Sequence, residues 1–206
     1  MTRLKLATRD IGGNKRMIRI TSGAFKGRRI ATTSGPGYRP ATEKVREALL
    51  SMLEARLKQW EGIVAADIFA GSGSLGFEAL SRGARRVHFL ENNSRAAKLI
   101  RSNARQLDLP QSRVRIAKRD AFRMVCSSPP EKFGLAFIDP PYKKGLLVPF
   151  LERFLHAGWM QDSGLIAAEV EQELSLDPER FSGLELLAQR TYGQTRIYLW
   201  RTKVCD

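Results

Sequence analysis

From residue 63 onward the chain repeats one pattern: a short apolar run, a turn rich in glycine or acidic residues, and a segment with helical periodicity. The apolar runs have strand length and lie at 63–69, 87–90, 113–117, 135–138 and 165–170. Helical segments follow the first four of them, over 74–81, 94–107, 121–126 and 146–157. Repeated strand–helix units of this kind predict a mainly parallel sheet with helices on both faces.

The C-terminal part of the chain has a different pattern. Two apolar-alternating runs, 184–192 and 195–200, flank Gly193-Gln194, which is typical of a β-hairpin. We therefore expect an α/β fold with a mostly parallel, seven-stranded sheet that ends in an antiparallel hairpin at one edge.

Composition narrows the class of protein. Of the 206 residues, 43% are hydrophobic and 27% are charged, which are ordinary globular values. No apolar run approaches the ~18 residues that a membrane span requires. Cys126 and Cys205 belong to no Cys-x-x-Cys pair, and His88 and His156 are too few for a zinc centre. We expect a cytoplasmic protein with no disulfide framework, no metal site and no membrane partner.

Positive charge is concentrated near the N-terminus. The formal charge is +14, and residues 1–46 hold twelve of the 35 Lys and Arg residues but only two of the 21 acids. Clustered cations favour a nucleic acid partner, because each phosphate contact releases condensed counterions. A solvated basic tail is the alternative. The residues that we expect to contact RNA are Lys26, Arg28, Arg29, Arg39 and Arg46.

Three segments are expected along the chain. Residues 1–16 contain Gly12-Gly13-Asn14 and lack periodicity, which is typical of a flexible basic leader. Residues 17–60 form a basic, RNA-binding extension with a short strand and turn, then a helix from 43 to 60 that Thr42 caps. Residues 61–206 contain the sheet.

The turn after the first long apolar run matches a nucleotide-binding pattern. Gly71, Gly73 and Gly76 fit Gly-x-Gly-x-x-Gly between a strand and a helix. By itself this pattern also describes an ordinary tight turn. Four acids strengthen it, because each lies at or just after the end of a predicted strand, where ligands bind in such sheets. These acids are Asp67, Glu91, Asp120 and Asp139.

The acids also indicate which ligand binds. Carboxylates near the glycine turn repel a pyrophosphate but tolerate a sulfonium and an ammonium group. The sequence also lacks the Gly-x-x-x-x-Gly-Lys-Ser/Thr pattern of a phosphate-binding loop. S-adenosylmethionine is therefore the expected cofactor, with Glu91 accepting hydrogen bonds from its ribose.

The segment Asp139-Pro140-Pro141-Tyr142 follows the fourth apolar run. Two prolines fix the backbone and remove two N–H donors, which leaves carbonyl acceptors. The Asp139 carboxylate and the Pro140 carbonyl are suited to accept the two N–H bonds of an exocyclic amine, and Tyr142 offers a face for an extruded base. The segment predicts methyl transfer to a base amine, with Asp139 stabilising the developing positive charge.

These motifs together resemble one family. The chain resembles the amino-group nucleic-acid methyltransferases in two motifs, Asp-x-Phe-Ala-Gly-Ser-Gly and Asp-Pro-Pro-Tyr. The stretches at 19–23, 26–28, 39–42, 45–49 and 191–195 resemble specifically the bacterial small-subunit (16S) ribosomal RNA guanine-N2 methyltransferases, over residues 17–202. The resemblance implies a Rossmann-like class I methyltransferase domain at 61–206 and, as substrate, guanine 966 of 16S ribosomal RNA, as naked RNA or in an assembling particle.

The resemblance also implies a role for each matching residue. The catalytic motif is Asp139, Pro140, Pro141 and Tyr142. The residues expected to bind S-adenosylmethionine are Asp67, Ala70, Gly71, Ser72, Gly73, Glu91, Asp120 and Ala121.

Two alternatives stay open at this point. The same motif serves adenine-N6 methylation of DNA or RNA, although no large inserted segment is present to read a DNA groove. A non-catalytic RNA-binding assembly factor on the same fold is the other alternative, and the intact acidic and Pro-Pro-Tyr residues argue against it.

Overall fold

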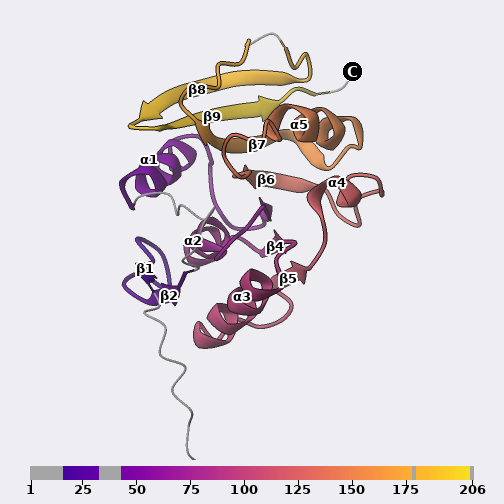
Figure 1. The fold of residues 1–206 in the computed structure, drawn as a ribbon. Helices are drawn as coiled ribbons and strands as arrows, with labels where there is room; N and C mark the ends of the chain where they lie inside the picture. The colour runs from indigo at the N-terminus through magenta and orange to yellow at the C-terminus, as the bar shows by residue number, and fades with distance from the viewer. Residues whose placement is uncertain (1–15, 33–42, 178–179, 205–206) are drawn as a thin grey trace, which may run out of the picture.

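A computed structural model describes residues 16–32, 43–177 and 180–204 (Figure 1). Its centre is a seven-stranded sheet in the order β5-β4-β3-β6-β7-β9-β8. The strands are β3 (Val64–Ile68), β4 (Arg86–Leu90), β5 (Val114–Ala117), β6 (Phe133–Ile138), β7 (Met160–Glu171), β8 (Leu184–Tyr192) and β9 (Thr195–Thr202). The first five run parallel, and β9 pairs antiparallel with both β7 and β8. The predicted fold class is confirmed.

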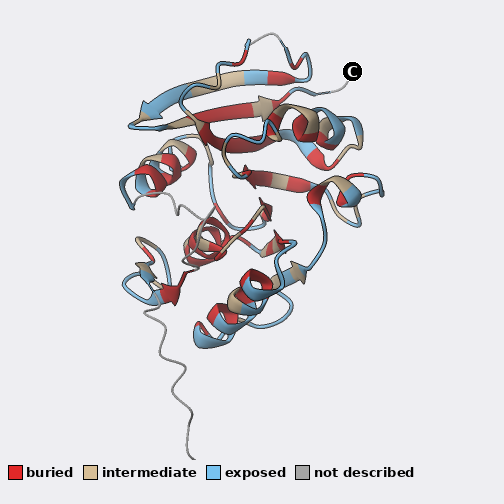
Figure 2. Ribbon diagram, viewed as in Figure 1, coloured by how far each residue is buried: buried red, intermediate tan, exposed pale blue. Residues whose placement is uncertain are grey.

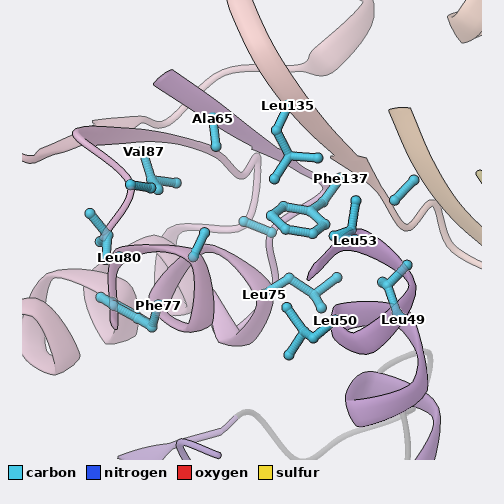
Figure 3. Close-up of a cluster of buried hydrophobic side chains, with 14 of the residues drawn as sticks. Leu49, Leu50, Leu53, Ala65, Leu75, Phe77, Leu80, Val87, Leu135 and Phe137 are labelled. Carbon is cyan, nitrogen blue, oxygen red and sulfur yellow. The ribbon is translucent and has the colours of Figure 1, made fainter. Parts of the chain in front are cut away.

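Helices cover both faces of this sheet, so each face has its own core (Figure 2). Consecutive residues of a strand point to opposite faces, and accordingly Ala65 and Ala66 of β3 belong to different hydrophobic clusters. In Figure 3, Leu53 and Leu75 lie beside Phe137 in the first cluster. The helices of the first face are α1 (Glu43–Glu54), α2 (Ser74–Arg82) and α3 (Ser94–Gln106). Those of the second are α4 (Ala121–Met124) and α5 (Leu147–His156). No helix in the described ranges has the length and apolarity needed to cross a membrane.

The N-terminal extension shares the first of these cores. β1 (Met17–Arg19) and β2 (Arg29–Ala31) pair antiparallel, and Ile20 and Ile30 are buried in the same cluster as the α2 side chains. The turn between them docks on the end of α2, where the Ala24 N–H donates to the Ser81 carbonyl at 2.7 Å. Gly23 is required at this contact, because a Cβ there would lie 1.9 Å from the same carbonyl oxygen. Of the predicted leader 1–16, residues 1–15 lie outside the described residues, and the Arg16 carbonyl accepts from the Thr32 N–H at 2.9 Å.

The helix predicted over 43–60 is too long. α1 ends at Glu54, and Thr42, its predicted cap, lies outside the described residues. The Arg56 guanidinium donates to the Met52 carbonyl at 3.0 Å and to the Leu187 carbonyl of β8 at 3.3 Å. The Arg56 side chain thus satisfies a carbonyl of the last turn of α1 and links that turn to β8. The chain after α1 is not helical, and it buries Trp60.

A buried ionic cluster joins the extension to α2. We call Arg46, Glu78 and Arg82 the anchor cluster. Glu78 is 1% exposed and accepts from the Arg46 Nε at 3.2 Å, from the Thr21 N–H at 3.0 Å and from Arg82. Arg46 is 2% exposed and also donates to the Arg19 carbonyl at 2.9 Å. The prediction that Arg46 contacts RNA is therefore wrong for this structure: its charge is used inside the protein.

Candidate active site at the carboxyl ends of the strands

Four adjacent parallel strands deliver the predicted acids to one edge of the sheet. Asp67 lies on β3, Glu91 directly follows β4, Asp120 follows β5, and Asp139 directly follows β6. The strand order β5-β4-β3-β6 makes these strands neighbours. The chain passes from β3 to β4 and β5 on one side of β3, and then crosses to β6 on its other side. The direction in which strands are added therefore reverses between β3 and β6, which makes this the topological switch point of the sheet. Such a point forms the ligand crevice of open α/β sheets.

The glycine turn begins at the end of β3. The Asp67 carboxylate accepts from the Gly76 N–H at 2.9 Å and thereby ties the strand to the first turn of α2. Gly73 has φ 78°, and a Cβ on it would lie 2.9 Å from ring atoms of Phe77 and Phe89. The turn therefore needs glycine for both its backbone and its packing. Phe69, with φ 61°, carries backbone strain at the same turn.

Glu91 holds the turn from the side of β4. Its Oε2 accepts from the Gly71 N–H at 2.8 Å, and its Oε1 accepts from the Asn93 N–H at 2.7 Å. The carboxylate is buried. Both oxygens thus already have a backbone partner, and each keeps acceptor capacity for a ribose hydroxyl.

The remaining predicted cofactor residues lie beside Glu91 and the glycine turn, and we call this set at the ends of β3, β4 and β5 the rim. Asp120 is exposed and caps α4 by accepting from the Arg123 N–H at 3.1 Å, and Ala121 behind it is buried. Ala70 and Ser72 are buried in the glycine turn, where the Ala70 N–H donates to the Leu90 carbonyl at 3.1 Å. The structure therefore brings the eight predicted cofactor residues to the ends of three neighbouring strands.

The Asp139–Tyr142 segment leaves β6 beside the glycine turn. The Asp139 N–H donates to the Ile68 carbonyl at 3.4 Å, so the segment starts next to the end of β3. Pro140 is buried and Pro141 is exposed. Tyr142 is half-buried, and its hydroxyl lies 2.8 Å from Thr195 Oγ1 and 3.4 Å from Glu169 Oε1. The phenol is therefore fixed by β7 and β9.

Sequence reasoning missed Glu169 and assigned no role to Thr195. Glu169 lies on β7, one residue beyond Ala168, which pairs with Ile138 of β6. The parallel register therefore puts Glu169 beside Asp139. A signal was present, because Glu169 is the single charged residue within the apolar run 165–170. A charge in a buried strand is rarely tolerated without a function or a partner.

Asp67, Asp139 and Glu169 form what we call the acidic crevice. Burial raises the pKa of Asp67 to about 8, with Glu91 contributing and the Gly76 N–H opposing. Burial, followed by the charges of Glu169 and Asp67, holds the pKa of Asp139 well above its usual range. Burial raises the pKa of Glu169 to about 7. Carboxyl groups gathered without a cation are suited to receive one from a ligand.

The crevice fits S-adenosylmethionine on the chemistry of its side chains. Carboxylates of the kind that offset a sulfonium and an ammonium group lie near the glycine turn, and the carboxylates of Glu91 and Asp120 at the neighbouring strand ends are acceptors of the kind that a nucleoside requires. The described residues contain no group of three or more His, Cys, Asp or Glu side chains that could hold a metal ion.

The predicted RNA contacts lie on the extension. Lys26, Arg28 and Arg29 are exposed, whereas Arg39 falls outside the described residues. Arg28 is partly engaged, because its guanidinium pairs with Asp108 at 3.3 Å and donates to the carbonyls of the α3 end. Two of the five predicted residues, Lys26 and Arg29, are thus exposed, and their side chains form no ion pair within the described part of the chain.

Comparison with known proteins places this architecture. The chain is 32% identical to ribosomal RNA small subunit methyltransferase D of Escherichia coli K12, over 89% of each chain. It is 31% identical to the protein of the same name from Haemophilus influenzae, over 89% of this chain and 93% of that one. A solved structure of yhhF from Escherichia coli matches with a TM-score of 0.78 at 28% identity, covering 92% of this chain and all of that one.

A more distant structure shares the fold. The 16S rRNA N2 G1207 methyltransferase RsmC of Thermus thermophilus, solved with AdoMet and guanosine, matches with a TM-score of 0.66 at 17% identity over 93% of this chain and 50% of that one. The fold is thus that of the AdoMet-dependent methyltransferases. Residues 18–201 also match the family model described as conserved hypothetical protein 95. The chain therefore belongs to this family, together with the ribosomal RNA small subunit methyltransferase D proteins.

Proposed function

We propose that this protein transfers a methyl group from S-adenosylmethionine to the exocyclic N2 of a guanine in small-subunit ribosomal RNA. The observation that carries the proposal is the position of Asp139 and Pro140, at the switch point of the sheet and beside the glycine turn. The names of the relatives, which are small-subunit ribosomal RNA methyltransferases, support the RNA class. Guanine 966 of 16S ribosomal RNA is the nucleotide that we propose.

The cofactor supplies an electrophilic methyl group on a positively charged sulfur. Gly71 and Gly73 let the backbone approach it, Glu91 and Asp120 orient its nucleoside, and Asp67 offers the carboxylate that offsets its charge. None of these contacts requires movement of the sheet, because each residue is positioned by a strand end or a helix cap. The rim is therefore organised before a ligand binds.

Asp139 and Pro140 hold the acceptor. Their carboxylate and carbonyl oxygens accept the two N–H bonds of the amine, which orients its lone pair toward the methyl group. The N–C bond would form as the bond between the cofactor's sulfur and its methyl carbon breaks, and the amine would then lose a proton to water. Positive charge that develops on the nitrogen lies next to the Asp139 carboxylate, and burial strengthens that interaction. Tyr142 contributes an aromatic face whose orientation is fixed through its hydroxyl by Thr195 and Glu169.

Comparing ribosomal RNA from cells with and without this protein tests the proposal. Total RNA is digested to nucleosides and to oligonucleotides, and mass spectrometry identifies both the modified base and its position. The proposal expects one N2-methylguanosine in small-subunit RNA to disappear with the protein and to return with the intact gene. Loss of N6-methyladenosine instead would favour the adenine enzyme, and an unchanged methylation pattern would favour a non-catalytic assembly factor.

A further inference from the structure

Glu169 has a buried carboxylate oxygen that no described group satisfies. The residue is 3% exposed, and its Oε1 accepts weakly from the Tyr142 hydroxyl at 3.4 Å. Its Oε2 is buried and has no hydrogen-bond partner among the residues that the structure describes. Leaving a buried acceptor unpaired costs free energy, and for a charged group the cost is larger. A protein retains such an atom when something else supplies the donor.

The place of this oxygen indicates where the donor comes from. Ala168 pairs with Ile138, so Glu169 and Asp139 occupy the next positions along neighbouring parallel strands. The charge of Glu169 raises the pKa of Asp139, as expected for close carboxyl groups. Tyr142, which contacts Glu169 directly, belongs to the same segment as Asp139. The unpaired acceptor therefore lies in the crevice to which the proposed function assigns the base.

The chemistry of the base distinguishes guanine from adenine at this position. On its Watson–Crick edge guanine carries an N1–H donor directly beside the N2 amine. Adenine carries an unprotonated N1, which is an acceptor, beside its N6 amine. An ionised carboxylate is an acceptor only, so above its pKa Glu169 pairs with the guanine edge and repels the adenine edge.

We infer that Glu169 selects guanine, by accepting the N1–H of the base whose N2 amine is held by Asp139 and Pro140. This inference rests on the proposed function and names the residue that restricts it to one base. Oε2 is buried in the free protein, so neighbouring groups must make room when a base enters. The Tyr142 hydroxyl stays tethered to Thr195 at 2.8 Å, whereas its contact with Glu169 at 3.4 Å is weak enough for the base to replace it.

The experiment uses two RNA substrates that differ at the target base. One carries guanine, and the other carries 2-aminopurine, which keeps the N2 amine but presents an unprotonated N1. The quantity measured is kcat/KM for methyl transfer under saturating S-adenosylmethionine. We expect the unaltered protein to prefer guanine by about 10- to 100-fold, the usual effect of a hydrogen bond to a charged group.

Glu169→Gln sharpens the comparison. A glutamine amide donates to the unprotonated N1 of 2-aminopurine, so the preference for guanine should collapse or reverse. A residue that served only the fold would lower both rates together and leave their ratio unchanged. Glu173→Gln, which alters an exposed acid shortly after β7, is the matched control and should leave the ratio as it was.

Each outcome separates the inference from the function beneath it. Equal rates on guanine and 2-aminopurine in the unaltered protein overturn the role of Glu169 but leave guanine methylation standing, and this arm needs no variant to fold. An unchanged ratio in folded Glu169→Gln overturns it as well. If the unaltered protein methylates neither substrate but modifies an adenine control, the proposed function fails and the inference fails with it.

Discussion

The molecule buries charge in two places, and it treats the two differently. In the anchor cluster, Glu78 receives donors from Arg46, Arg82 and Thr21, so the buried carboxylate faces cations and N–H groups. In the acidic crevice, burial raises the pKa values of Asp67, Asp139 and Glu169, and the charges of Glu169 and Asp67 raise that of Asp139 further. The anchor cluster has its cations within the chain, whereas no cation of the described residues acts on the acidic crevice.

The difference shows what each cluster is for. A buried ion pair with its full set of partners holds the N-terminal extension against α2, although hydrophobic residues could do that as well. Buried carboxyl groups without a cation destabilise the free protein and stabilise a cationic ligand. Removing a charge from each cluster should therefore have opposite effects on stability.

The largest expected effect is on stability, at the anchor cluster. Glu78→Gln leaves Arg46 buried without a carboxylate and Arg82 with Glu54 alone, so the free energy of unfolding should fall by about 3–5 kcal/mol. Urea denaturation followed by circular dichroism measures it. Glu54→Gln removes the exposed partner of Arg82 at 2.7 Å and should cost no more than about 1 kcal/mol. Equal losses in the two variants would refute the distinction between the anchor cluster and a surface pair.

Removing a charge from the acidic crevice should lower activity and not stability, in contrast to Glu78→Gln. Asp139→Asn keeps one acceptor oxygen and removes a poorly solvated charge, so we expect unchanged or higher stability together with a loss in turnover on the order of 10²-fold. Asp139→Ala should lose more, because the amine then has only the Pro140 carbonyl. Single-turnover transfer with saturating cofactor and RNA measures both. A parental rate in Asp139→Ala would remove Asp139 from catalysis.

Glu91 tests the residues at the ends of β3, β4 and β5 that we expect to bind the cofactor. Glu91→Ala removes the acceptor for the Gly71 and Asn93 N–H groups and for a ribose, so S-adenosylmethionine should bind about 10- to 150-fold more weakly. RNA affinity should change little. Titration calorimetry on the folded variant gives the cofactor affinity, and an unchanged value would place Glu91 outside the binding site.

The smallest expected effect concerns charges on the surface of the extension. If Lys26 and Arg29 each contact one phosphate, changing both to Gln should make the slope of log K against log salt shallower by about 1.4, where K is the association constant for single-stranded RNA. Lys132→Gln, which alters an exposed cation directly before β6 and outside the extension, is the control and should leave the slope unchanged. Loss of affinity with an unaltered slope would argue against phosphate contacts.

Sequence reasoning predicted the sheet well because its signals are local. The hairpin strand over 184–192 agrees residue for residue, and the first helix after the glycine turn differs only at Arg82. The acids of the rim were found because each follows an apolar run, and a parallel sheet brings the ends of such runs to one edge. Strand order then made them neighbours.

The errors came from partners that are distant in sequence. Arg46 resembles any other cation of a basic segment until α2 brings Glu78 against it, 32 residues further along. Arg56 ends α1 by reaching Leu187, which is 131 residues away. Glu169 gave a signal, an acid within an apolar run, but only the β6–β7 register shows that it lies beside Asp139. Periodicity does not carry information about such pairs.

The comparison between the two clusters depends most on whether the crevice carboxyl groups gain a cation when the cofactor binds. Asp67, with a pKa of about 8, is largely protonated at pH 7 in the free protein and should ionise beside a sulfonium. Calorimetric binding of S-adenosylmethionine in two buffers of different ionisation enthalpy counts the protons released. The unaltered protein should release about one proton more per cofactor than Asp67→Asn at pH 7, since the cofactor's own amine titrates alike in both. Equal proton counts in the two proteins, with binding intact, would contradict the account.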